Sequence, residues 1–423
     1  MFDIYMYLCL KYFDLSQRNK LKIINDPIYG FITIPNELIF DLIEHPYFQR
    51  LRRISQMGLS HLVYPGAQHT RFHHALGCLH LMRKAVQVLR FKSVEIDETE
   101  EEALYIAILL HDIGHGPFSH AMEHSIIEGV SHEQLSLKFM QKLNEEFEGK
   151  LSLAIQLFTN QYHKEFLGQL LASQLDIDRL DYLKRDSFYT GVAEGNINSE
   201  RLITMLNVKN NHLVVEEKGI YSVEKFLVAR RLMYWQVYLH KTGLVAEQLL
   251  IKMLKRAKYL VQNEFELNAS KNLTFFMKQQ GAIETLSDEV IDRFASLDDY
   301  DIVSAIKEWV DCGDEILESL CKMILHRNLL KIKLKNKPIS EEKFNKHFNA
   351  VKEKHQYNDE EASYFVFSGS TSNLAYQTMT TPINILYKNG KIKDVSKASD
   401  QLNLKALAKP VVKYYMCYPK SNN

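Results

Sequence analysis

The sequence predicts a mostly helical fold with a short N-terminal β-hairpin and a smaller α+β region at the C-terminal end. Apolar residues recur at spacings of three and four through most of the chain, which indicates amphipathic helices. Strand-like alternation is confined to short stretches. With 423 residues and 46% hydrophobic content, the chain can bury a large core, so we expect one large domain with an appendage.

Each element has its own signal along the chain. Residues 1–19 start with an apolar stretch that lacks a basic start and a cleavage site and is too short to span a bilayer, so we expect an N-terminal extension without an export signal. β-formers alternate between Pro27 and Pro35, which predicts the hairpin.

The main domain is expected at 20–326 and the α+β region at 327–423. Helical spacing covers 38–57, 73–88, 100–111, 132–143, 165–186, 222–262 and 302–326. Strand-like runs lie at 213–215, 364–367 and 383–387.

The composition argues against several classes of function. Lys plus Arg equals Asp plus Glu at 52 each, so no global field attracts the chain to nucleic acid or to a membrane, and neither is an expected partner. Five cysteines without a Cys-x-x-Cys pair suit a reducing cytoplasm and argue against a thiolate metal site. Metal ligands should therefore be His and Asp, and phosphate binding should be local.

The segment HDIGHGPFSH, residues 111–120, concentrates the chemistry. The apolar helix before it delivers His111 and Asp112 at its C-terminal end, and Gly114 and Gly116 then permit a tight turn. Converging imidazole and carboxylate groups suit Mn, Fe, Zn or Mg. A His-Asp pair alone is weak support, since most buried histidines are hydrogen-bonded core groups.

Two further segments carry companion residues. Arg71 to His74 opens a helix upstream, and a downstream apolar helix contains several acids. Its Asp178, Tyr182 and Asp186 are four residues apart and therefore share one face. Charged groups among leucines need partners. The alternative explanation for the acids is an ion-pair network with two nearby arginines, Arg179 and Arg185.

Five motifs occur in a fixed order: Asn25 to Gly30, Phe48 to Arg52, Pro65 to Ala67, Arg71-Phe72-x-His74 and His111 to His120. With the downstream Asp178, they resemble the HD superfamily of metal-dependent phosphohydrolases. They are most similar to its deoxynucleoside triphosphate (dNTP) triphosphohydrolases, which include bacterial dGTPase-like enzymes and the animal protein that joins a sterile alpha motif to an HD domain. The similarity runs from about Lys22 to Lys331. It implies an HD-domain helical core and a role in control of the dNTP pool.

The resemblance also implies roles for single residues in an attack of water on the α-phosphorus, with triphosphate leaving intact. Four residues would hold the metal that acidifies this water: His74, His111, Asp112 and Asp178. His73 stands where the family has a non-ligand. His120 would be the general acid, kept charged by Glu123 one helical step away. His115 and His132 would bind phosphate oxygens or support the acid, and either could instead be structural.

Substrate-binding residues follow from the same resemblance. Three arginines would contact the triphosphate: Arg71, Arg179 and Arg230. Two tyrosines on the face of Arg230 would run along the substrate, although aromatic residues at this spacing are more often core: Tyr234 and Tyr238. Four residues would select the sugar: Gln56, Met57, Tyr182 and Asp186. Met57 stands where the family often has leucine, so discrimination against ribose could be looser.

Parts of a second, activating nucleotide site between subunits also match, so we expect a homo-oligomer, a dimer or a tetramer. The matching positions are Lys22, Asn25, Glu44, Arg52, Arg201, Lys218, Arg327 and Lys331. Glu44 stands where the animal enzyme reads guanine with a shorter aspartate, which puts guanine specificity in doubt. The alternative is that these are solvated surface charges.

Two other functions compete with dNTP hydrolysis. The first keeps the metal site but acts on nucleoside monophosphates, cyclic dinucleotides or guanosine tetraphosphate, and the helix with Arg230, Tyr234 and Tyr238 argues against it. The second is a non-catalytic nucleotide sensor. The complete ligand set together with His120 and Glu123 argues against a sensor, which could lose these groups without penalty.

Overall fold

The computed structural model describes residues 22–420, apart from 124, 282, 284, 375, 378–381, 401–408 and the side chain of His120. The predicted hairpin consists of β1 (Ile23–Asp26) and β2 (Gly30–Thr33), which pair antiparallel. Its turn forms because Asp26 Oδ1 accepts hydrogen bonds from the backbone N–H groups of Ile28 and Tyr29, at 2.9 and 3.0 Å. The extension expected at residues 1–19 lies outside the described residues.

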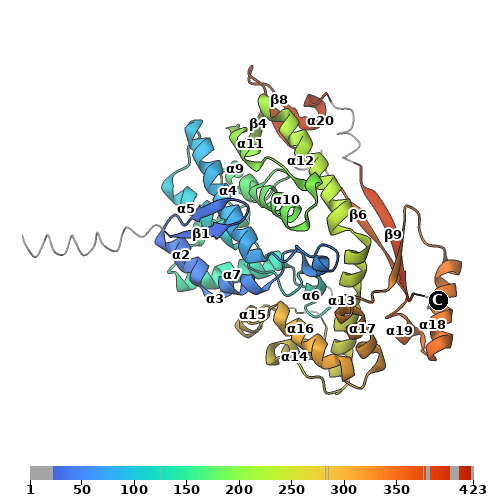
Figure 1. The fold of residues 1–423 in the computed structure, drawn as a ribbon. Coiled ribbons are helices and arrows are strands. Elements are labelled where there is room, and N and C mark those ends of the chain that lie inside the picture. The colour runs from blue at the N-terminus through green and yellow to red at the C-terminus, as the bar shows by residue number, and fades with distance from the viewer. Residues whose placement is uncertain are drawn as a thin grey trace, which may run out of the picture.

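The predicted helical core is confirmed and carries the His and Asp motifs. It consists of α4 (Arg71–Phe91), α5 (Glu98–Leu110), α7 (His132–Glu146), α8 (Ser152–Phe158), α9 (Glu165–Leu171) and α10 (Ile177–Thr190). Helix α4 packs against both α5 and α10 (Figure 1). Side-chain caps begin α5, α7 and α10, because Asp97, Ser131 and Asp176 accept bonds from backbone N–H groups of the first turn.

Four stretches with continuous helical spacing are divided in the structure. The first comprises α2 (Glu37–Glu44), α3 (Pro46–Gln49) and the 3₁₀ helix η1 (Arg50–Arg53). The second breaks between α9 and α10. The third comprises α12 (Ile220–Met233), the π-helix η5 (Tyr234–Tyr238) and α13 (Lys241–Gln262). The last comprises α16 (Asp299–Glu308), η6 (Trp309–Asp311) and α17 (Glu315–Leu325). Apolar periodicity continues across these breaks because both neighbouring helices face the same core.

Shorter helices complete the helical part: η2 (Gly58–Leu62), α6 (His120–Glu123), η3 (Ala193–Gly195), α11 (Ser199–Thr204), η4 (Glu217–Gly219), α14 (Lys271–Lys278) and α15 (Asp288–Ala295). The C-terminal region adds α18 (Glu341–His355), α19 (Asp359–Ala362) and α20 (Val395–Ala398). Among the described residues, no helix is long and apolar enough to cross a membrane.

The predicted α+β character of the C-terminal region is confirmed by two small sheets. One has the order β5 (Lys331–Lys335), β9 (Val411–Tyr418), β6 (Phe367–Asn373), and Figure 1 shows β6 and β9 on the side away from the hairpin. The other joins β3 (Leu206–Lys209) and β4 (His212–Glu216) to β7 (Asn384–Leu386) and β8 (Ile392–Asp394). Because β7 pairs in parallel with β4, this sheet spans both expected regions, and the boundary after 326 stays a prediction.

Candidate metal centre and active site

The four predicted metal ligands come together between three core helices. His74 lies in the first turn of α4, His111 and Asp112 follow the C-terminal end of α5, and Asp178 lies in the first turn of α10. Asp178 Oδ1 is 3.1 Å from His74 Nε2 and 3.7 Å from His111 Nε2. The carboxylate of Asp112 is 3.6 Å from His111 Nε2 and 3.8 Å from His74 Nε2. Two imidazole nitrogens therefore face two carboxylates.

This cluster fits a divalent cation. His111 Nδ1 donates to the carbonyl of Ile108 at 2.7 Å, so its Nε2 is the atom that carries a lone pair. Among the described residues, this buried Nε2 has no hydrogen-bond partner. Burial alone would raise the pKa of Asp178, but its contacts with His111 and His74 lower that pKa well below the usual value. The carboxylate thus stays charged, and nitrogen and oxygen donors of this kind bind Mn, Fe, Zn or Mg.

A buried chain of charges lies behind His74. His74 Nδ1 donates to Asp181 Oδ2 at 2.7 Å, which directs Nε2 toward the cluster. Asp181 also accepts two bonds from Arg185, at 2.9 and 3.0 Å, and Arg185 donates to Asp26 at 2.7 Å. Burial acts to raise the pKa of Asp181, but Arg185 and His74 outweigh it and lower that pKa to about 2. Asp181 is a supporting residue without a predicted role, although its place three residues after Asp178 puts it on the same side of α10.

Gly77 makes room for this chain on the middle of α4. A Cβ atom at this position would lie 2.0 Å from Asp181 Oδ1 and 2.2 Å from Arg185 Nη2. Any larger residue would push the ion pair away from His74. Both arginines of α10 form ion pairs. Arg185 pairs with Asp181, and Arg179 pairs with Asp176 at 3.4 Å. Their partners are thus neighbours of the predicted ligand and not the ligand itself.

His73 is placed apart from the cluster. Its Nδ1 accepts a bond from the backbone N–H of Thr70 at 3.2 Å and contacts the Thr70 hydroxyl at 2.9 Å. This reciprocal contact caps the start of α4. His73 therefore acts as a capping residue, in keeping with its predicted non-ligand role.

The loop after Asp112 brings an arginine and a histidine to the cluster. Arg71 pairs with Asp112 and donates to Ser119 Oγ from Nη2 at 2.8 Å. His115 Nε2 is 3.3 Å from the other carboxylate oxygen of Asp112. Burial, followed by the charge of Arg71, lowers the pKa of His115 to about 3, so this imidazole is neutral near pH 7. The turn needs Gly114, because a Cβ there would lie 2.2 Å from the backbone nitrogen of Ser136.

Two other predicted catalytic residues, His132 and Glu123, lie beside His115. The His132 ring stacks on the His115 ring, with centroids 3.9 Å apart and planes inclined by 18°. Glu123 Oε1 is 3.0 Å from His132 Nδ1. The side chain of His120 lies outside the described residues, so its role as general acid and its pairing with Glu123 stay predictions.

A cavity of about 790 Å³ opens beside the cluster. Most of the predicted substrate residues line it: Gln56, Met57, Arg71, Arg179, Tyr182, Asp186, Tyr234 and Tyr238. Asp112, His115, His132 and Asp178 line it too. Arg230 is buried on α12 and does not belong to this lining. Asp186 accepts from the Tyr238 hydroxyl at 2.7 Å and contacts His69 Nε2 at 2.7 Å, so His69 is a supporting residue that sequence reasoning missed.

The predicted activator residues fall into three groups on different elements. Lys22, Asn25, Glu44 and Arg52 lie around the hairpin and the first helices, Arg201 contacts the Lys218 carbonyl at 3.4 Å, and Arg327 donates to the Leu62 carbonyl at 2.8 Å near Lys331. All except Lys22 are exposed. Among the described residues, no hydrogen bond or ion pair joins one of these groups to another.

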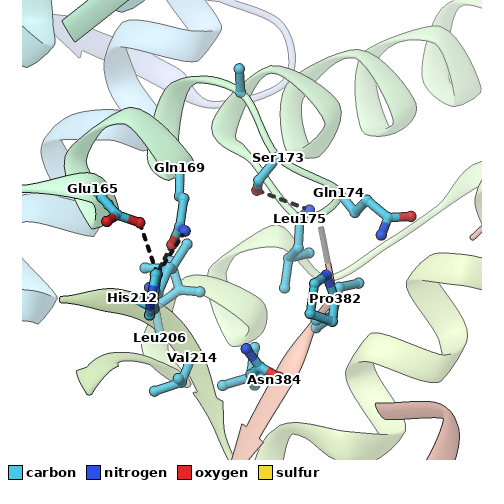
Figure 2. A pocket seen from close by; sticks show the side chains of 14 residues that line it. Glu165, Gln169, Ser173, Gln174, Leu175, Leu206, His212, Val214, Pro382 and Asn384 are labelled. Carbon is cyan, nitrogen blue, oxygen red and sulfur yellow. Dashed lines mark hydrogen bonds and ion pairs between the residues drawn. The ribbon is translucent and has the colours of Figure 1, made fainter. Parts of the chain in front are cut away.

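A second cavity, of about 320 Å³, lies between α9, β4 and β7. Figure 2 shows His212 reaching toward both Glu165 and Gln169, at 3.3 and 3.2 Å. None of the predicted site residues lines this cavity. Its lining includes the segment Ser173–Leu175, which leads into α10, and it contains no cluster of His and Asp like that of the larger cavity.

Comparisons with known proteins give the family of this chain. Family models match the HD domain at residues 71–186 and the HD associated region at 197–274. A solved phosphohydrolase from Bacteroides thetaiotaomicron is 49% identical, with a TM-score of 0.92 over 95% of this chain and 100% of that chain. Uncharacterized protein YwfO of Bacillus subtilis is 33% identical over 89% of this chain and 88% of its own length.

A relative with a stated activity matches a smaller part of the chain. The deoxynucleoside triphosphate triphosphohydrolase SAMHD1 homolog of Dictyostelium discoideum is 33% identical over 54% of this chain and 48% of its own length. The His–Asp cluster lies within the segment that the HD-domain model matches. This chain therefore belongs to the HD superfamily of metal-dependent phosphohydrolases, close to the dNTP triphosphohydrolases.

Proposed function

We propose that this protein hydrolyses deoxynucleoside triphosphates to deoxynucleoside and intact triphosphate, by attack of water on the α-phosphorus. One observation carries the proposal: a single cavity is lined by the acids of the His–Asp cluster, by arginines and by three tyrosines. Arginines suit a polyphosphate, and tyrosines suit the nucleoside beside it. The similarity to the Dictyostelium triphosphohydrolase supports the same substrate class.

Four residues would hold the divalent ion: His74, His111, Asp112 and Asp178. The buried Nε2 of His111, which faces two carboxylates, supports this ligand set. When bound, the ion would supply positive charge that acidifies water and offsets the charge of the phosphates. The donor set is compatible with Mn, Mg, Fe or Zn.

The protein's own groups would bind and protonate the substrate. Arg71, oriented by Ser119 and Asp112, would bind phosphate oxygens together with Arg179, whose Nε donates to the Ser173 carbonyl at 2.9 Å. Neutral His115 can hydrogen-bond to a phosphate oxygen. His120 would protonate the departing oxygen of the deoxynucleoside, as its motif implies.

Sugar recognition would depend on the end of the cavity near α10. Asp186 is held at both oxygens, by His69 and by Tyr238, and would accept a bond from the 3′-hydroxyl. Tyr182 would crowd the 2′ position. The buried Oε1 of Gln56 has no hydrogen-bond partner among the described residues, so a hydroxyl donor from the sugar would satisfy it.

An activating nucleotide bound between subunits is the second part of the proposal. The Lys and Arg groups around the hairpin and the first helices, near Arg201 and near Arg327 would be brought together by a second copy of the chain. Hydrolysis of nucleoside monophosphates or other phosphates is the competing function, since the His–Asp cluster alone would serve it equally well.

Chromatography of reaction products tests the proposal. The purified protein is incubated with Mn or Mg and each dNTP, alone and in mixtures, with GTP and dGMP as controls. Deoxynucleoside together with intact triphosphate is the expected result, and activity that appears only in mixtures would support the activator site. Turnover of dGMP without any dNTP hydrolysis would favour the competing function.

A further inference from the structure

The catalytic loop contains two consecutive residues in a strained backbone conformation. Phe118 and Ser119 have φ angles of 48° and 51°, in the left-handed region that non-glycine residues rarely adopt. Such residues persist only where the surrounding structure fixes them. Ser119 matters because its hydroxyl accepts bonds from Arg71 Nε and Nη2, at 3.3 and 2.8 Å. The position of the Arg71 guanidinium therefore depends on this turn.

One carboxylate from a distant part of the chain holds the turn. Asp299, at the start of α16, accepts from the backbone N–H of Phe118 at Oδ1, at 2.8 Å. Its Oδ2 accepts from the backbone N–H of Ser55, also at 2.8 Å. Ser55 immediately precedes Gln56 and Met57, which line the substrate cavity. Asp299 thus ties together two segments that border the same cavity.

The neighbours of Asp299 reinforce the same contact. The Leu297 carbonyl accepts from the buried Arg50, which also donates to the carbonyl of Ile113 at 2.7 Å. Asp298 pairs with Arg53 at 2.5 Å. Three consecutive residues at the N-terminal end of α16, Leu297 to Asp299, therefore bind residues of the 50–55 segment, although they lie outside the segments that the family models match.

Both oxygens of Asp299 face main-chain donors, and its side chain is buried. Burial raises the pKa of Asp299, and the bonds from Ser55 and Phe118 oppose that change. No ion pair of Asp299 is found among the described residues, and its hydrogen bonds come from the main-chain N–H groups of Ser55 and Phe118 and from the Ser55 side chain. This arrangement depends on two acceptor atoms, which an amide cannot provide.

We propose that Asp299 is a positioning residue for the phosphohydrolase reaction, which sets Arg71 through the strained turn at Phe118 and Ser119 and sets Gln56 through Ser55. The inference rests on the proposed function only in the choice of substrate. Asp299 touches neither the substrate nor the predicted metal ligands and acts through backbone geometry.

Asp299→Asn tests the inference, because the amide NH₂ would oppose one of the two N–H donors. We expect kcat/KM for the dNTP that the wild type hydrolyses fastest to fall at least tenfold, with metal content unchanged. Asp301→Asn is the matched control on the same helix. Within the described part of the chain, the Asp301 side chain accepts only from the backbone N–H of Asp298, at 2.9 Å, so this change should leave kcat/KM within twofold. Wild-type kcat/KM in Asp299→Asn would overturn the inference.

A double-mutant cycle separates positioning from general destabilisation. If Asp299 acts through the turn, the effects of Asp299→Asn and Ser119→Ala should be strongly non-additive, because both displace Arg71. Effects that multiply within twofold would contradict the inference. If Asp299→Asn does not fold, Asp299→Glu keeps two acceptor oxygens at a shifted position and enters the same cycle, with the same two outcomes.

Failure of the proposed function is recognised separately. A wild-type protein that hydrolyses no dNTP contradicts that function and leaves the geometry of Asp299 open to a binding test. The cycle is then repeated by calorimetry with inorganic triphosphate and Mn²⁺ as the probe. Weaker triphosphate binding in Asp299→Asn, non-additive with Ser119→Ala, would support the inference, and unchanged binding would overturn it.

Discussion

The predicted metal ligands and the predicted activator residues differ in the support that the chain gives them. His74 and Asp178 are 3.1 Å apart, and the buried Asp181 and Arg185 lie behind them. The activator residues are mostly exposed and lie in three groups. A cluster inside one chain is completed by that chain's own packing, whereas exposed groups on separate elements need a second molecule to converge. The two regions should therefore respond very differently to mutation.

Loss of a ligand should have the largest effect. Asp178→Ala removes the carboxylate shared by His74 and His111, so bound metal and activity should be lost together, with activity reduced by roughly a thousandfold or more. Metal analysis and dNTP hydrolysis of the folded variant check this. His73→Ala is the control, since His73 caps α4, and should retain metal. Full metal content in Asp178→Ala would refute the ligand set.

A smaller effect is expected at Asp181, which contacts the predicted ligand His74 but is not itself a predicted ligand. Asp181→Asn removes the charge that orients His74, so metal affinity should fall about 10- to 100-fold. Asp26→Asn is the matched control, because it also weakens an ion pair of Arg185 but does not touch His74. Competitive chelator titrations of both variants measure the difference. Equal affinities would show that the buried chain stabilises the fold without tuning the metal.

Mutation of the exposed region should change regulation alone. Lys331→Ala should reduce the stimulation seen in dNTP mixtures by about fivefold, the lower range of allosteric coupling, and leave the unstimulated rate with a single dNTP unchanged. Rates measured over a range of activator concentrations give the comparison. Unaltered stimulation would remove Lys331 from the activator site and weaken the contrast between the two regions.

The smallest expected effect concerns the contact between the hairpin, near predicted activator residues, and α4, which carries the predicted ligand His74. His80 on α4 stacks on Tyr29 of the hairpin turn, with ring centroids 4.9 Å apart, and its Nε2 is buried without a partner among the described residues. Burial, followed by Lys84, lowers the pKa of His80 to about 4. The unfolded chain thus binds this proton more readily, and stability present at pH 7 is lost as the pH falls from about 6.5 toward 4.

Urea unfolding at pH 7 and pH 5 measures this loss, for which we expect about 1–2 kcal/mol after allowance for solvent screening. His80→Phe keeps an aromatic ring on Tyr29 without a titratable group, so its stability should depend less on pH. An identical pH dependence in the variant and the wild type would show that other groups are responsible.

Much of the fold was predictable because apolar spacing encodes the helices. The ligand set came from the family resemblance and stays a prediction, although its four residues lie together in the structure. Helix ends were predicted less well: Pro46 begins a new helix within one stretch and Asp176 caps the start of α10, whereas apolar periodicity continues across both breaks.

The sequence alone determined the helical class and the hairpin, since each depends on short-range spacing, and its family motifs named the His and Asp residues of the candidate metal site. Only the tertiary structure placed Asp181 and Arg185 behind His74, through the space left by Gly77, and brought Asp299 to the turn at Phe118. Asp299 is separated from Phe118 by 181 positions. No local pattern records such a contact, because buried polar groups find partners wherever packing brings the chain together.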